Sequence, residues 1–144
     1  MQWKDEAVEK LKRYGAMQKA LENIPEEIHR LETDATALRS PSAEPVSVTG
    51  GGRREDALIN NLAERQELEW TFKQVQQWLV ITDRGLAALT PEERLVLQRM
   101  YLYPEKGAID RLCTELGVEQ ATVYRKRDKA LRQFTVALYG FLET

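Results

Sequence analysis

A glycine separates two amphipathic helical patterns near the end of this chain, and this arrangement restricts the possible folds more than any other feature. Residues 108–116 (AIDRLCTEL) place apolar side chains at the spacing of one buried helix face. Gly117 follows at once, and glycine readily takes the left-handed conformation that ends a helix. After a three-residue connection the helical pattern resumes at Gln120 and extends to about Tyr139. Helix, glycine turn and helix predict a helix-turn-helix unit.

A helix start precedes this unit. Thr90 is a hydroxyl cap, Pro91 fits the first helical position, and Glu93 completes a capping box. Apolar residues then continue to about Tyr103, before residues 104–107 (PEKG) end the helix. Residues 90–144 are therefore predicted to form a helix-turn-helix DNA-binding domain.

Charge is unevenly distributed, although the net charge is only −2. Residues 120–140 carry five basic side chains and one acidic side chain, whereas residues 1–89 carry 12 basic and 15 acidic side chains. Attraction to phosphate acts locally, within about one Debye length (~8–10 Å). The basic last helix on an acidic body therefore predicts double-stranded DNA as the partner.

The geometry of a helix in the major groove selects the residues that would contact DNA. Val123, Ala130 and Leu131 are expected to face inward. Glutamine can bond adenine and arginine can bond guanine with two hydrogen bonds each, while Ala and Thr can touch a thymine methyl group. The predicted base-contacting residues are Gln120, Ala121, Thr122 and Arg125. The predicted phosphate-contacting residues are Tyr124, Lys126, Lys129, Arg111 and Lys106.

The rest of the chain divides into two helical patterns and a connector, which gives an all-α class. Residues 1–39 are expected to form a helical coiled-coil segment, residues 40–53 a flexible linker, and residues 54–89 a long connecting helix. Residues in the first segment follow the spacing of an a/d seam: Trp3, Ala7, Lys10, Tyr14, Met17, Leu21, Ile24, Ile28, Leu31, Ala35 and Leu38. The two arms can pair within one chain as a hairpin or between two chains as a homodimer.

Three details qualify this pattern. Pro25 is expected to kink or restart the first helix, with Asn23 as the N-cap. Asn61 and Arg65 fall where the second seam needs apolar residues. The aromatic residues of the arms, among them Trp70, are spaced like packing residues.

Composition argues against an enzyme. One cysteine, Cys113, and one histidine, His29, leave little for a metal site or a nucleophilic pair, so no metal or cofactor is expected. Cys113 is interpreted as a packing residue and His29 as a solvated helix residue. The sequence has no apolar run of about 18 residues and no export signal, so we expect a cytoplasmic protein without a membrane partner.

Residues 89–134 resemble region 4 of bacterial sigma factors. The likeness rests on Leu89–Glu93, Leu116–Val118, Thr122–Val123 and Lys129–Arg132. Over its whole length the chain is similar to small phage-encoded region 4-like proteins, including the ArpU-like late-gene regulators. The resemblance implies promoter binding and contact with RNA polymerase. Two positions depart from the pattern: Glu119 replaces the usual hydroxyl cap, and Cys113 replaces alanine or glycine.

These observations lead to one main hypothesis and two alternatives. Residues 1–89 lack a basic aromatic surface for melted bases, so we expect a DNA-binding regulator of phage late genes rather than a sigma factor. A second possibility is a packaging-site binder similar to phage terminase small subunits, although these usually place the DNA-binding part first. A third is a helical adaptor whose basic helix binds an acidic protein.

Overall fold

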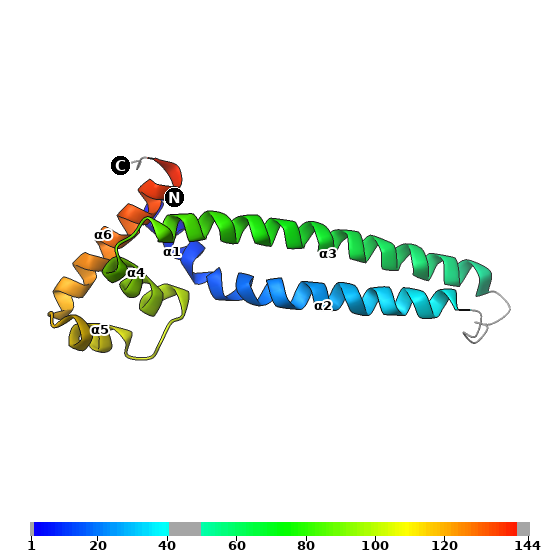
Figure 1. Ribbon diagram of the computed structural model, residues 1–144, viewed down its shortest axis with the longest axis horizontal. Helices are drawn as coiled ribbons and strands as arrows, with labels where there is room; N and C mark the ends of the chain where they lie inside the picture. Colours follow the sequence, from blue (N-terminus) through cyan, green and yellow to red (C-terminus); the bar gives the residue numbers. More distant parts are fainter. Residues whose placement is uncertain (1, 41–49, 141–144) are drawn as a thin grey trace. The chain divides into compact units, whose positions relative to one another are not determined.

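The computed structural model describes residues 2–40 and 50–140. These residues form helices and no strand, which confirms the all-α class. The elements in chain order (Figure 1) are α1 (Trp3–Lys12), α2 (Tyr14–Arg39), α3 (Gly50–Ala87), α4 (Pro91–Leu97), the π-helical turn η1 (Gln98–Leu102), α5 (Ala108–Leu116) and α6 (Gln120–Tyr139).

The described residues fall into two compact units. The first, which we call the head, comprises the described parts of residues 1–18 and 77–144, and the second, the hairpin, comprises residues 19–76. This division differs from the predicted boundaries, because α1 belongs with the C-terminal helices and not with a separate segment 1–39. The physical reason is the apolar face of α1, which is buried in the core of the head.

In the hairpin, α2 and α3 run side by side in opposite directions (Figure 1). Ile24, Leu31 and Ala35 of the predicted seam are buried on α2. Asn61 on α3 is also buried, and its Nδ2 donates a 2.8 Å hydrogen bond to the carbonyl oxygen of Leu31. A buried polar side chain with a single suitable partner fixes the register of two packed helices. The first seam is therefore paired within the chain.

The Asn61 side chain is satisfied at both ends. Its Oδ1 accepts a 2.8 Å hydrogen bond from Nε of Arg65, one turn further along α3. The two residues that interrupt the apolar pattern of α3 thus form one hydrogen-bonded unit. Such a unit is tolerated in a buried position because both the amide nitrogen and the amide oxygen of Asn61 have a hydrogen-bond partner.

The expected restart of the helix at Pro25 and the expected end of the linker are both wrong. α2 continues through Pro25, so Asn23 does not cap a new helix. Pro25 is exposed while its neighbour Ile24 is buried, so packing on one face outweighs the hydrogen bond lost on the other. The predicted linker, residues 40–53, extends too far towards the C-terminus, because α3 already begins at Gly50. The rest of that prediction, residues 41–49, lies outside the described residues.

The core of the head is built on α6. Phe134, Leu131 and Ala130 have no exposed surface and pack in one cluster with Ala7 and Leu11 of α1. α3 approaches this cluster closely through a glycine: a Cβ atom at Gly85 would lie 2.7 Å from the ring of Phe134. The core thus holds α6 against α1 and the last turns of α3.

Candidate nucleic-acid interface

A second cluster of the head joins the two helices of the predicted helix-turn-helix. Val96 of α4, Leu112 of α5 and Val123 of α6 are completely buried against one another. Cys113 packs at the edge of this cluster, in agreement with its interpretation as a packing residue. Val123, Ala130 and Leu131 all face inward, as predicted. The opposite face of α6 is therefore directed outward.

The turn between α5 and α6 has the geometry that its sequence predicts. Gly117 takes the left-handed conformation, with φ 66° and ψ 38°. The N–H group of Val118 donates a 3.1 Å hydrogen bond to the carbonyl oxygen of Cys113, which closes α5 with a Schellman-type bond. Glu119 makes no side-chain cap on α6, so the departure at this position leaves the first turn of α6 without a side-chain acceptor.

The exposed face of α6 gathers three unpaired cations. Arg125, Lys129 and Arg132 recur at intervals of four and three residues, so they share one side of the helix with Ala121. All four residues are exposed, and no ion pair within residues 2–40 and 50–140 involves the three cations. We call Ala121, Arg125, Lys129 and Arg132 the basic face.

The other predicted base-contacting residues lie at the edges of this face. Gln120 is exposed at the first position of α6, on the side of Tyr124 rather than Arg125. Thr122 is half-buried. Tyr124 is 37% exposed, and the guanidinium of Arg127 lies 4.9 Å from the centre of its ring. The structure thus brings Ala121 and Arg125 together, whereas Gln120 belongs to the end of the helix.

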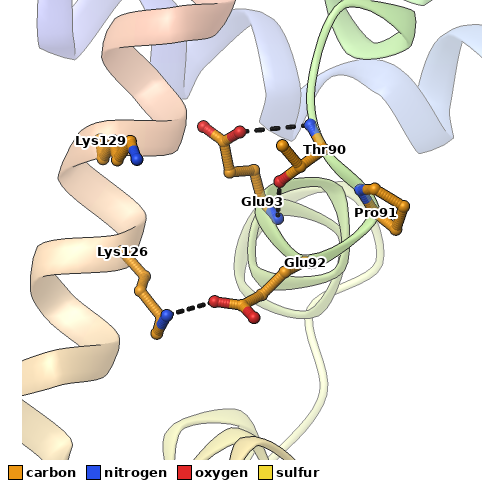
Figure 2. A pocket seen from close by; sticks show the side chains of 6 residues that line it. All are labelled: Thr90, Pro91, Glu92, Glu93, Lys126 and Lys129. Atoms are coloured by element: carbon orange, nitrogen blue, oxygen red, sulfur yellow. Dashed lines mark hydrogen bonds and ion pairs between the residues drawn. The ribbon is translucent and has the colours of Figure 1, made fainter.

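Lys126 is held by a carboxylate that lies 34 residues away in the sequence. Its Nζ forms an ion pair with Oε1 of Glu92 at the start of α4 (Figure 2). The pair lies in a pocket of about 470 Å³, lined by Thr90, Pro91, Glu92, Glu93, Lys126 and Lys129. A lysine paired with a carboxylate is less available to a phosphate. Breaking this pair would make the Lys126 ammonium fully available for the phosphate contact predicted for it.

The capping box beside this pocket is formed as predicted. The N–H group of Glu93 donates a 3.2 Å hydrogen bond to Oγ1 of Thr90, and the N–H group of Thr90 donates a 3.2 Å hydrogen bond to Oε1 of Glu93 (Figure 2). The reciprocal bonds fix where α4 begins. They also hold Glu92, one of the two residues between Thr90 and Glu93, next to α6.

The two predicted contacts outside α6 differ in their surroundings. Arg111 on α5 forms a 2.7 Å ion pair with Glu105. Lys106 is exposed in the turn before α5, and no ion pair in the described part of the chain involves it. Of these two cations, Lys106 is therefore the one whose charge is not offset by a neighbour.

One flank of α6 is tied to α1 by a charged cluster. Asp128 accepts from Arg127, at 3.0 Å from its Nε, and from Lys4 of α1, at 2.8 Å. Burial acts to raise the pKa of Asp128, but the hydrogen bonds from Lys4 and Arg127 outweigh it and hold this pKa below its ordinary value. Because folding lowers the pKa of Asp128, the cluster stabilises the head at neutral pH. This stabilisation is lost as the pH falls through the lowered pKa of Asp128.

Three features of this surface were not predicted from the sequence. Arg132 joins the basic face, Glu92 restrains Lys126, and Lys4 fixes Asp128. The spacing of Arg125, Lys129 and Arg132 was a visible signal for the first. The other two contacts join residues that are 34 and 124 positions apart, for which the sequence carries no local signal.

None of the described helices is both long and apolar enough to span a membrane, and no group of three His, Cys, Asp or Glu side chains among the described residues could hold a metal ion.

The comparisons with known proteins identify a family. No curated protein and no solved structure gave a significant match. Residues 37–135 match the family model described as Protein of unknown function (DUF1492), and since this match covers more than half of the sequence, the chain belongs to that family.

Proposed function

We propose that this protein is a sequence-specific double-stranded DNA-binding regulator of transcription, with α6 as its recognition helix. The observation that carries the proposal is the basic face: exposed, unpaired cations on a helix whose other side is completely buried. A helix of 20 residues is about 30 Å long, enough to enter a major groove with its first turns and pack on the head with its last turns.

The roles of the residues follow from their positions along α6. Arg125 lies near the N-terminal end of the basic face, where a recognition helix reaches base edges, and its guanidinium can donate two hydrogen bonds to guanine. Lys129 and Arg132 lie one and two turns further on, where phosphates run beside the helix. Gln120 at the first position can bond adenine.

The assignment to transcription rests on the likeness of residues 89–134 to sigma factor region 4. On the same likeness we propose that the protein belongs to a phage, acts on late genes in the cytoplasm and contacts RNA polymerase. We also propose a homodimer through the N-terminal helices, because helix-turn-helix proteins commonly bind two half-sites as dimers. A protein of this kind needs no catalytic group.

Lys129→Ala is expected to weaken binding of the full-length protein to every duplex by a similar factor and to reduce the salt dependence. One lost phosphate contact lowers the slope of log K against log salt concentration by about 0.9. Fluorescence anisotropy with labelled duplexes at several salt concentrations measures this slope. Lys19→Ala, an exposed lysine without an ion pair in the described hairpin, is the matched control. An unchanged slope for Lys129→Ala would contradict its phosphate role.

Glu92→Gln is expected to tighten DNA binding by a few fold at low salt. The change removes a negative charge beside the basic face and releases Lys126 from its ion pair. Exposed pairs of this kind stabilise a fold by only about 0–1 kcal/mol, so the melting temperature should change little. Competition binding with the same duplex measures the gain. Equal or weaker binding, with the fold intact, would show that Lys126 does not face DNA.

The adaptor alternative makes a different prediction for the same binding experiment. A basic helix that binds an acidic protein would bind duplex DNA weakly and without sequence preference. A packaging-site binder would bind specifically, but at sites that do not lie upstream of genes. The observation that favours DNA over an acidic protein is Arg125, a residue suited to bidentate recognition at the N-terminal part of an exposed helix face.

A further inference from the structure

One face of α3 in the hairpin is apolar and exposed. Ile59 and Trp70 are each 63% exposed and Leu62 is 46% exposed. With the exposed Gln66 and Lys73, these residues recur at intervals of three and four, which places them on one side of the helix. Asn61 and Val75, on the other side, are buried. We call Ile59, Leu62, Gln66, Trp70 and Lys73 the outer stripe.

The exposure of Trp70 corrects the expectation that it is a packing residue of the arm. Single exposed apolar residues are common on proteins, but three large ones in line on a helix mark an interaction surface. Tryptophan is also enriched among the residues that dominate binding energies at interfaces. α3 thus has two apolar faces, and α2 covers only one of them.

Charges lie at both ends of the outer stripe. Glu55 and Asp56 precede it, and Lys73 closes it. All three side chains are exposed, and none of them takes part in an ion pair within the described residues. The stripe therefore has a negative end, an apolar middle and a positive end.

We propose that the outer stripe is the surface on which a second copy of this chain docks, with the two α3 helices antiparallel and Gln66 near the two-fold axis. In this register Leu62 lies opposite Trp70 of the second copy, and Ile59 lies opposite the aliphatic stem of its Lys73. A two-fold axis makes both contacts occur twice. The surface is thus complementary to itself.

Charge selects the antiparallel direction. The antiparallel register brings Lys73 within about one turn of Glu55 and Asp56 of the second copy, on each side of the axis. A parallel pair would place Lys73 against Lys73 and the acidic residues against each other, and like charges at such positions repel. This inference rests on the homodimer of the proposed function but not on DNA binding. It assigns dimerisation to the outer stripe, because the a/d seam of α2 is already used within the chain.

The first experiment measures the mass of the full-length protein by light scattering over a concentration series. We expect a dimer that the double variant Leu62→Ser, Trp70→Ser converts to a monomer with unchanged helical circular dichroism. Tyr139→Ser, which alters an aromatic residue of the head that is 51% exposed, is the control and should remain dimeric. A monomeric wild type, or a dimer that persists in the double variant, would overturn the proposal.

A second experiment tests the direction of pairing. Lys73→Glu should weaken the dimer at low salt, and adding Glu55→Lys and Asp56→Lys should restore it, because every antiparallel contact is then reversed together. In a Cys113→Ala background, Gln66→Cys should form a disulfide-linked dimer on mild oxidation, whereas Thr36→Cys, exposed on α2, should not. No rescue and no selective cross-link at position 66 would overturn the antiparallel register.

The outcomes separate dimerisation from DNA binding. A monomeric double variant that still binds a single half-site would leave the DNA-binding proposal intact and support the outer stripe as the dimer surface. A dimer of the wild type that binds no duplex would contradict the proposed function without affecting the docking proposal. The two claims therefore fail in different measurements.

Discussion

Phe134→Ala is expected to lower the free energy of unfolding of the head by about 3–5 kcal/mol. Phe134 has no exposed surface and packs in the cluster that holds α1 and α6 together. Its removal loses the transfer free energy of an aromatic ring and leaves a cavity, which the packed helices fill only in part. Urea unfolding followed by circular dichroism measures the loss.

The neighbouring variant Gln133→Ala is the control for this prediction. Gln133 is exposed on α6, so its truncation should change the stability by less than about 0.5 kcal/mol. A loss below about 1 kcal/mol for Phe134→Ala would mean that the core of the head is not packed as described. Because Gly85 lies against the same ring, the cavity opens beside α3 as well as α1.

Arg125→Ala is expected to weaken binding to the specific duplex by about 1–3 kcal/mol, or roughly 5- to 150-fold, and to change binding to random DNA little. The reason is the loss of two hydrogen bonds to one guanine, which only the specific site offers in the right place. Arg125→Lys should not restore the full affinity, because an ammonium group lacks the planar fork of arginine. Competition with specific and random duplexes measures both affinities.

Two controls make this result specific to base reading. Arg132→Ala, on the same basic face, should weaken binding to specific and random duplexes alike, because phosphate contacts carry no sequence information. Arg53→Ala, an exposed arginine of the hairpin, should leave both affinities unchanged. An equal loss on both duplexes for Arg125→Ala would show that Arg125 contacts the backbone and not a base.

The helices around the turn could be predicted from sequence because their signals are local. The structure begins α4 at Pro91 with the predicted Thr90–Glu93 capping box and ends α5 at Leu116 before the left-handed Gly117. It also places α6 at Gln120–Tyr139, the predicted range. Caps, turns and apolar spacing act within one or two helical turns, so they can be read from neighbouring residues.

The partners of each helix could not be predicted in the same way. α1 carries the same seam pattern as α2, yet Ala7 and Leu11 are buried in the head. The ion pair of Lys126 with Glu92 and the exposure of Trp70 were missed for the same reason. Residue spacing shows that a face is apolar or charged but not what covers it.

The central claim is that α6 reads a DNA sequence, and selection of bound fragments tests it most directly. The full-length protein is incubated with sheared DNA of its source genome at moderate salt, and the bound fragments are sequenced. We expect enrichment of one short motif upstream of genes, present for the wild type and lost for Arg125→Ala. Bound fragments without any shared motif, or a motif that Arg125→Ala still selects equally, would contradict the account.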